Sequence, residues 1–102
     1  MVPKPSRLPR SGFRERGYRT IRTRFFSLKY RDNGSAGNRI GVVVGVAVDK
    51  RAVRRNFWER QAKAFLLRVP PAGKDLLLIV SPGVKTLTKK EFNQELSAAL
   101  PL

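Results

Sequence analysis

The chemistry available to this chain lies in a row of cations and the amide of Asn56, between residues 50 and 63. Asn56, Arg60 and Lys63 follow one another at spacings of four and three residues, so they share one side of a helix and form a line of donors about 10 Å long. An Arg side chain can bind two phosphate oxygens at once, and an Asn amide can orient a neighbouring Arg or bind an RNA oxygen. The sequence therefore predicts a phosphate-binding surface made of Arg51, Arg54, Arg55, Asn56, Arg60 and Lys63.

The cations at the start of this predicted helix are unfavourable for the helix itself. A helix N-terminus already carries about half a positive charge, so each cation there costs about a few tenths of a kcal/mol. Lys50, Arg51, Arg54 and Arg55 all lie in these opening turns. An anionic ligand across the helix start would offset that cost. The alternative interpretation is a solvated polar face without a ligand.

The composition favours a polyanionic partner and gives little support to catalysis. Lys and Arg number 22 against 7 Asp and Glu, for a net charge of +15 on 102 residues, and 41% of the residues are hydrophobic. A chain of this kind can fold as one domain, and a polyanion would relieve its self-repulsion. It contains no His and no Cys, so the commonest general base and thiol chemistry are missing. No apolar run approaches about 20 residues, which predicts a cytoplasmic protein without a membrane span.

The N-terminal stretch is strongly basic. Eight cations lie in the first 24 residues and are opposed only by Glu15. We interpret this stretch as a basic arm that contacts RNA, because Phe13 and Tyr18 can stack on bases while the cations bind phosphates. Residues 1–12 are predicted to be a flexible arm, and residues 13–102 a single RNA-binding α/β domain. The alternative is a solvated charged tail.

Three apolar runs predict β-strands, at residues 25–30, 39–48 and 75–80. The second and third runs are apolar on both faces, so each strand should be buried on both sides. With a helix between them, these strands are typical of a β-α-β unit on a mixed sheet, which makes the fold class α+β. The general rule for such units favours a right-handed crossover.

Two helices are predicted from capping signals and apolar periodicity. The first carries the row of cations, and it should begin with Asp49 as its capping residue and end before Pro70. The second spans residues 89–99. Thr88 is its predicted N-cap, and Glu91 at the third helical position completes a capping box.

The motif Ala-Val-Arg-Arg-Asn at residues 52–56 resembles the basic motif Ala-Val-x-Arg-Asn of the protein subunit of bacterial ribonuclease P. In that family cations follow at helical spacing, as Arg60 and Lys63 do here. This chain departs from the family at Phe57, where a cation is common. Further stretches match in the same order, and the similarity spans residues 13–100, with matches at residues 17–30, 39–44 and 73–80.

The resemblance implies a fold as well. It implies an α/β sandwich with a mixed four-stranded sheet and a left-handed β-α-β crossover, a fold that is ribosomal protein S5 domain 2-like. The resemblance and the general rule therefore disagree on the hand of the crossover. We follow the resemblance on this point.

The function implied by the resemblance is that of an accessory subunit of a ribonucleoprotein endoribonuclease. A catalytic RNA subunit, which holds most of the Mg²⁺, cleaves precursor tRNA at its mature 5′ end. The protein binds that RNA and the single-stranded 5′ leader of precursor tRNA, and supplies no catalytic residue and no metal ligand. Arg22 and Arg24 join the helix cations as implied RNA-binding residues, and Phe13 and Phe26 are candidates for the cleft that holds the leader.

Two other classes of protein share parts of this pattern. A small basic ribosomal or other structural RNA-binding protein would have the same composition, and only the motif around Asn56 in its strand context favours ribonuclease P. A DNA-binding or nuclease domain is disfavoured, because the sequence shows neither helix-turn-helix spacing nor clustered carboxylates.

Overall fold

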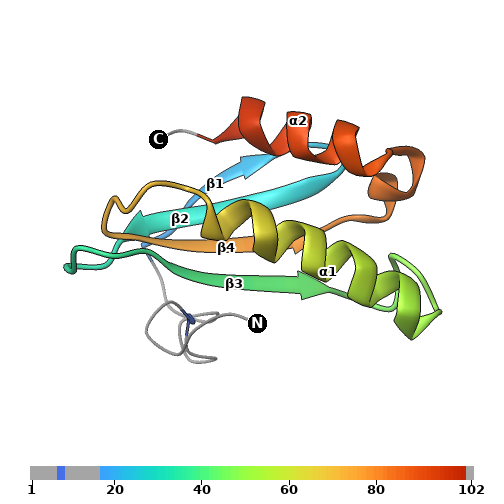
Figure 1. Cartoon of the computed structure of the whole chain (residues 1–102), viewed down its shortest axis with the longest axis horizontal. Helices are drawn as coiled ribbons and strands as arrows, with labels where there is room; N and C mark the ends of the chain where they lie inside the picture. Colours follow the sequence, from blue (N-terminus) through green and yellow to red (C-terminus); the bar gives the residue numbers. More distant parts are fainter. Residues whose placement is uncertain (1–6, 9–16, 101–102) are drawn as a thin grey trace.

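A four-stranded sheet with two helices on one face positions the candidate residues (Figure 1). The computed structural model describes residues 7–8 and 17–100. The strand order is β1-β2-β4-β3, and only β3 and β4 pair in parallel, so the predicted mixed sheet and α+β class are confirmed. The elements are β1 (Arg19–Arg22), β2 (Phe26–Asp32), β3 (Arg39–Val44), α1 (Ala52–Leu67), β4 (Lys74–Val80), the 3₁₀ helix η3 (Pro82–Thr86) and α2 (Lys89–Ala99).

The β3-α1-β4 unit has a left-handed crossover. Strands β3 and β4 are parallel neighbours, and α1 lies on the near side of the sheet in Figure 1. Seen from that side with both strands pointing upward, the chain moves to the left as it passes from β3 to β4. The hand is therefore the one that the family resemblance implied. The right-handed expectation from the general rule is wrong for this unit.

The first strand was not among the predicted elements. β1 lies inside the stretch that we interpreted as a basic arm, and it pairs antiparallel with β2 so that Ile21 is opposite Leu28. The turn between them is held by Thr23, whose side-chain oxygen accepts hydrogen bonds from the backbone N–H groups of Phe25 and Phe26. β1 contains one apolar residue, Ile21, so its sequence shows no alternating strand pattern. This edge strand forms through backbone pairing with β2 rather than through burial of its side chains. Most of the predicted arm, including Phe13, lies outside the described residues.

The two strands predicted to be buried on both sides differ in the structure. β4 is central, and Leu76, Leu77 and Leu78 are all buried, as predicted. β3 is the last strand of the sheet and ends at Val44 rather than at residue 48. Its Val43 is 37% exposed, so the expectation of burial on both sides is wrong for this strand. The reason is that Val43 lies in register with Ile79 on the face of the sheet away from the helices, and the described helices cover only the other face.

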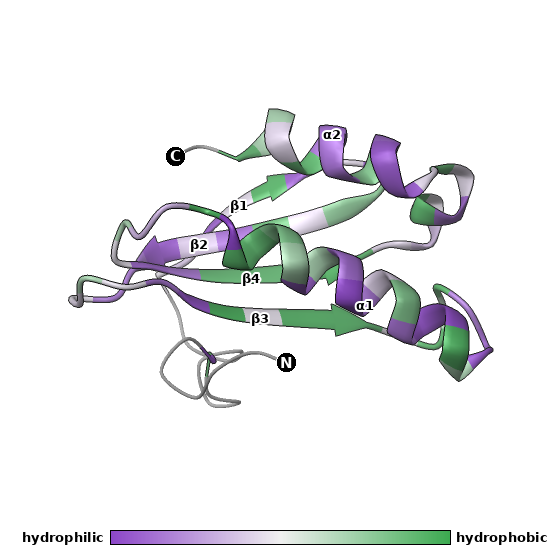
Figure 2. Ribbon diagram, in the orientation of Figure 1, coloured by the Kyte–Doolittle hydropathy of each residue, from purple (hydrophilic) through white to green (hydrophobic). Residues whose placement is uncertain are grey.

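Three buried aromatic rings join the sheet to both helices. The Trp58 ring of α1 meets the Phe92 ring of α2 edge to face at 5.3 Å between centroids, and Phe92 meets Phe26 of β2 at 6.3 Å. Ala62 and Leu66 continue the buried side of α1 at four-residue spacing. Figure 2 shows the corresponding apolar colouring along β3 and β4, beneath helices of mixed hydropathy.

Phe26 belongs to this core. Its side chain is fully buried and contacts Phe92, so the prediction that it lines a leader cleft is wrong. The alternation of β2 explains the error: Phe26 and Leu28 face the helices, whereas Ser27 and Lys29 face the other side of the sheet.

The predicted capping box of α2 is confirmed. The Thr88 side chain accepts from the Glu91 backbone N–H at 3.2 Å, and the Glu91 carboxylate accepts from the Thr88 backbone N–H at 2.9 Å. These bonds, first of all the one from the Thr88 backbone, lower the pKa of Glu91. They satisfy two N–H groups that a helix start otherwise leaves without partners.

Removing this cap should weaken the fold measurably. We expect Thr88→Ala to lower the free energy of unfolding by about 1 kcal/mol. Urea unfolding followed by circular dichroism measures the change. Thr86→Ala is the matched control, because the exposed Thr86 hydroxyl donates only to the Gly83 carbonyl and caps no α-helix. Equal losses in the two variants would contradict the assignment of the cap.

Candidate nucleic-acid interface

The start of α1 is organised by Asp49, but not in the way predicted. The helix begins at Ala52 with Arg51 as its N-cap residue, and no side chain caps it, so the prediction of Asp49 as the cap is wrong. Asp49 instead accepts from the backbone N–H of Arg51 at 3.0 Å and from its guanidinium at 3.3 Å. Because of these hydrogen bonds, first of all the one from the Arg51 side chain, the pKa of Asp49 falls to about 2. Asp49 is therefore charged at neutral pH and holds the exposed Arg51 side chain beside the helix start.

The two arginines that follow also make contacts within the chain. Arg55 donates from Nη1 to the backbone carbonyls of Asp49 and Lys50, both at 3.0 Å, and so fixes the segment that leads into α1. The guanidinium of Arg54 lies over the Phe57 ring at 5.0 Å from its centroid. Both side chains are only partly exposed. These contacts hold both guanidinium groups in place, so binding a phosphate would cost little side-chain entropy.

The predicted line of donors exists on the outer side of α1. Asn56 and Arg60 are exposed, and together with Lys63 they line a shallow hollow. Lys63 forms an ion pair with Glu59 at 2.9 Å, so part of its charge is offset. Val53 lies at the edge of the same hollow and is 74% exposed, which no packing requirement explains. The structure thus brings these three predicted residues together on one accessible surface.

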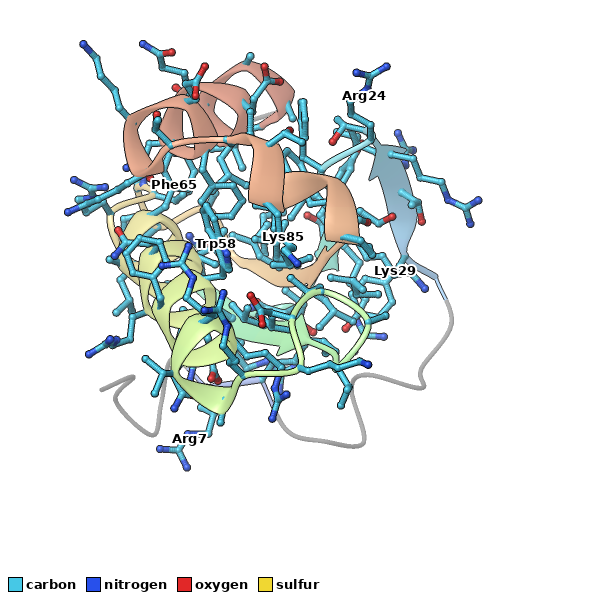
Figure 3. All side chains as sticks on the ribbon, turned by 90° about the vertical axis from the view of Figure 1, so that its right-hand side faces the viewer. Arg7, Arg24, Lys29, Trp58, Phe65 and Lys85 are labelled. Atoms are coloured by element: carbon cyan, nitrogen blue, oxygen red, sulfur yellow. The ribbon has the colours of Figure 1, made fainter. Side chains whose placement is uncertain are left out.

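Arg22 and Arg24 lie elsewhere. Arg22 is on β1, the strand farthest from β3, while α1 packs mainly on β3. Arg22 is opposite Ser27, so it faces the side of the sheet away from the helices. Arg24 follows in the β1–β2 turn, and Figure 3 shows it at the opposite corner of the molecule from the start of α1. These two arginines form a second exposed basic region rather than an extension of the α1 line.

Sequence reasoning missed a cation that joins the start of α1. Lys85 of η3 is close enough to Asp49 to lower its pKa, and it lines a hollow with Lys50 and Arg51. Figure 3 shows Lys85 at the end of the molecule where α1 begins. No local pattern could have found it, because residue 85 is separated from this segment by the whole of α1 and β4.

A buried carboxylate organises three strands on the face of the sheet away from the helices. Asp75 of β4 is fully buried and lies in register with Arg31 of β2 and Arg39 of β3. Its oxygens accept from Arg39 at 2.7 and 2.8 Å, from Arg31 at 3.1 Å and from Asn33 at 3.3 Å. Burial acts to raise the pKa of Asp75, but these hydrogen bonds together lower it. The Arg31 guanidinium also lies 4.5 Å from the centroid of the Tyr18 ring.

The carboxylates are too few to neutralise the cations of this chain, which has 22 Lys and Arg against 7 Asp and Glu. Within residues 17–100 every carboxylate except Glu95 accepts from a cation or a backbone N–H. That part of the chain contains no cluster of three or more His, Cys, Asp or Glu residues suited to a metal ion. None of its helices is both long enough and apolar enough to cross a membrane.

Comparison with known proteins identifies the family of this chain. The family model described as Ribonuclease P matches residues 10–101, which include every candidate residue described above. The chain belongs to the ribonuclease P protein family. The ribonuclease P protein component of Ralstonia pickettii is 46% identical over 59 residues, covering 56% of this chain and 42% of that protein. The component from Azoarcus is 37% identical over 81 residues, covering 76% of this chain and 67% of that protein.

Solved structures of ribonuclease P proteins share the fold. The protein from Thermotoga maritima superposes with a TM-score of 0.73 at 22% identity, covering 83% of this chain and 86% of that chain. A mutant of the Staphylococcus aureus protein superposes with a TM-score of 0.82 at 19% identity, covering 95% of this chain and 86% of that chain. The fold implied by the resemblance is therefore confirmed.

Proposed function

We propose that this protein is the accessory protein subunit of ribonuclease P, which binds the catalytic RNA and the 5′ leader of precursor tRNA and assists 5′ maturation of tRNA. The observation that carries the proposal is the exposed line of Asn56, Arg60 and Lys63, next to a helix start where Asp49 orients Arg51. Membership of the ribonuclease P family supports the same conclusion. This role would place the protein in the cytoplasm, where precursor tRNA is processed.

In this proposal the protein acts by holding phosphates. Arg51 and Arg60 would bind phosphate oxygens of the catalytic RNA, and the positive end of the α1 dipole would favour the same anions. Neutralising phosphates lowers the repulsion between the RNA subunit and its RNA substrate. Mg²⁺, held mainly by the RNA subunit, would supply the activation of water and the stabilisation of the leaving oxygen.

The face of the sheet away from the helices is the better candidate for the leader. Arg22 and Lys29 lie on this face, because they are opposite Ser27 and Thr20 in the β1–β2 register. Figure 3 shows Lys29 on the side of the molecule away from α1. Cations spaced along an extended strand suit a single-stranded backbone. Phe26 takes no part in this path, since it is buried in the core.

Reconstitution tests the proposal. At low Mg²⁺ concentration, adding the purified protein to a bacterial catalytic RNA should increase cleavage of precursor tRNA at the mature 5′ end. The protein alone should produce no cleavage. RNA binding without any increase in cleavage would favour a structural RNA-binding protein instead, and cleavage by the protein alone would overturn the assignment of catalysis to the RNA.

The α1 line should matter for assembly but not for folding. We expect Asn56→Ala combined with Arg60→Ala to weaken binding to the catalytic RNA about 10- to 100-fold, because two exposed donors are lost without any buried contact. Filter binding measures the affinity, and thermal unfolding should change little. Arg55→Ala should weaken binding too, but it should also lower stability, because Arg55 holds the carbonyls of Asp49 and Lys50.

Lys74→Ala is the matched control for this charge change. It also removes one cation, but Lys74 pairs with Asp32 at the end of β4 away from the α1 line. Its effect on affinity should stay below about threefold. Similar losses in the control and in the double variant would remove the α1 line from the interface.

A further inference from the structure

A large hollow on the described surface lies between the C-terminal half of α1 and α2, and the proposed function does not use it. Its volume is about 670 Å³, within the range of ligand-binding pockets. Figure 3 shows Phe65 between the two helices, farther from the sheet than Trp58. Phe65 is nine residues after Asn56, or about half a turn around the helix axis, so this groove and the α1 line lie on opposite sides of α1.

The lining of the groove combines three kinds of chemistry. Phe65, Val69 and Leu100 supply an apolar floor with one aromatic ring. Polar side chains follow on α2, where Asn93 and Ser97 are one turn apart. Cations form the rim, and no carboxylate of a described residue lines the groove. The polar and charged lining residues are Arg68, Lys89, Lys90, Asn93, Gln94 and Ser97.

Two observations show that this groove is suited to an anionic ligand with a hydrogen-bond donor. The Oδ1 atom of Asn93 is buried and accepts no hydrogen bond within the described part of the chain. A buried polar atom without a partner is unfavourable, so a ligand N–H that reached Oδ1 after a rotation of the Asn93 side chain would be favourable here. Lys89 and Lys90 occupy the first two positions of α2, where positive charge is unfavourable, and neither forms an ion pair with a described residue. Glu91 cannot offset them fully, because its carboxylate is engaged by the Thr88 backbone.

We propose that the groove binds one unpaired nucleotide of the RNA partner. The base would stack on Phe65 and donate an N–H to Asn93, and the phosphate would lie between Arg68 and Lys90. Base stacking on an aromatic ring together with cations for the phosphate is the usual way in which proteins hold single-stranded RNA. The proposal rests on the proposed function, since it takes RNA as the ligand.

The charge of the chain argues against a second copy as the occupant. Each copy carries a net charge of +15, so a homodimer through this cationic rim would bring like charges together. An acidic peptide would meet the charge requirement, but RNA is the favoured occupant because the proposed function already makes RNA the partner of this chain. With a nucleotide here, RNA would contact α1 on two opposite sides, through the donor line and through the groove.

Filling the groove without changing the charge tests the proposal. Ser97→Leu places a larger apolar side chain into the groove, and Ala98→Leu adds a similar bulk at the neighbouring exposed position, which does not line it. The probe is a 12-nucleotide single-stranded RNA with one 4-thiouridine, and affinity is measured by fluorescence anisotropy with the full chain. We expect Ser97→Leu to weaken binding about tenfold, as for the loss of one base-stacking contact, and Ala98→Leu to change it less than about twofold.

Photocrosslinking of the same RNA distinguishes the groove from the α1 line. In the wild-type protein, crosslinked peptides should include Phe65 or residues of α2, and these should disappear in Ser97→Leu while crosslinks near Asn56 persist. Phe65→Leu is a second variant that removes the ring and keeps the apolar character, and it should reproduce the loss. Thermal unfolding of each variant establishes that the fold is retained.

The possible failures are separable. Equal affinities for Ser97→Leu and Ala98→Leu, with crosslinks confined to the α1 line, would overturn the groove proposal and leave RNA binding in place. A wild-type protein that binds neither this RNA nor the catalytic RNA would instead remove the proposed function. Loss of binding to a Glu- and Phe-containing peptide in Ser97→Leu, with RNA affinity unchanged, would show that the groove serves a protein partner and would overturn the proposal.

Discussion

RNA affinity should fall about 10³- to 10⁵-fold when the salt concentration rises from about 50 to 200 mM, if about 6–10 phosphates are neutralised. The reason is counterion release: each phosphate that meets a cation frees condensed ions, and added salt opposes that release. The structure supplies enough cations for this. Those that are exposed and form no ion pair with a described residue are Arg19, Arg22, Arg24, Lys50, Arg60, Arg68, Lys85, Lys89 and Lys90.

The measurement is a series of binding curves with the catalytic RNA at graded KCl concentrations and constant Mg²⁺. Arg60→Gln should lower the slope of log affinity against log salt by about one, the share of a single phosphate contact. Lys74→Gln should leave the slope unchanged, because Asp32 already neutralises Lys74. A slope near zero for the wild-type protein would show that the +15 charge does not drive binding.

Asp75→Ala should be the most destabilising of the substitutions considered for the folded chain, with a loss of about 3 kcal/mol in the free energy of unfolding. Removing one partner of a buried ion pair leaves the other charge uncompensated, which typically costs about 3–5 kcal/mol. Here two guanidinium groups would lose their common partner across β2, β4 and β3. Arg39 remains 34% exposed, so water limits the loss to the lower end of that range. Urea unfolding at pH 7 measures it.

The matched control is Asp32→Ala, which removes the same side chain from an exposed ion pair with Lys74. It should cost less than about 1 kcal/mol. Equal effects of the two substitutions would show that the buried network contributes no more than a surface pair.

Acid provides a second test of Asp75. Its pKa in the folded protein lies below the ordinary value of 3.8, so its stabilising contribution is complete above that value and is lost as the pH falls through the lower, folded pKa. The wild-type protein should therefore lose stability steeply below about pH 4. Asp75→Asn should start less stable and show a shallower fall over the same range.

Features that depend on residues close together in the chain could be predicted. The capping box of Thr88 and Glu91 spans four residues, and the donor line of Asn56, Arg60 and Lys63 spans eight, so helical geometry alone brings their members together. The central strand β4 could be predicted because an uninterrupted apolar run is typical of a strand buried on both faces, although the same reasoning failed for β3.

Features that depend on the pairing of distant segments could not. Strand β1 has the composition of a basic tail and becomes a strand only because β2 pairs with it. Phe26 had the residue type of a cleft aromatic, but the register of β2 turns it toward Trp58 and Phe92. The hand of the crossover followed from family resemblance, whereas the general rule for β-α-β units gave the opposite answer.

By itself the sequence determined the excess of positive charge, the lack of His and Cys, and the spacing of the donors along α1, and these together predicted an RNA-binding protein. The tertiary structure alone decided which cations act together. Lys85 joins the start of α1, Arg22 and Arg24 lie on a separate surface, and Asp75 holds arginines from two other strands. The physical reason is that charge and helical period are local properties of a chain, whereas the grouping of side chains from different elements depends on strand order and register.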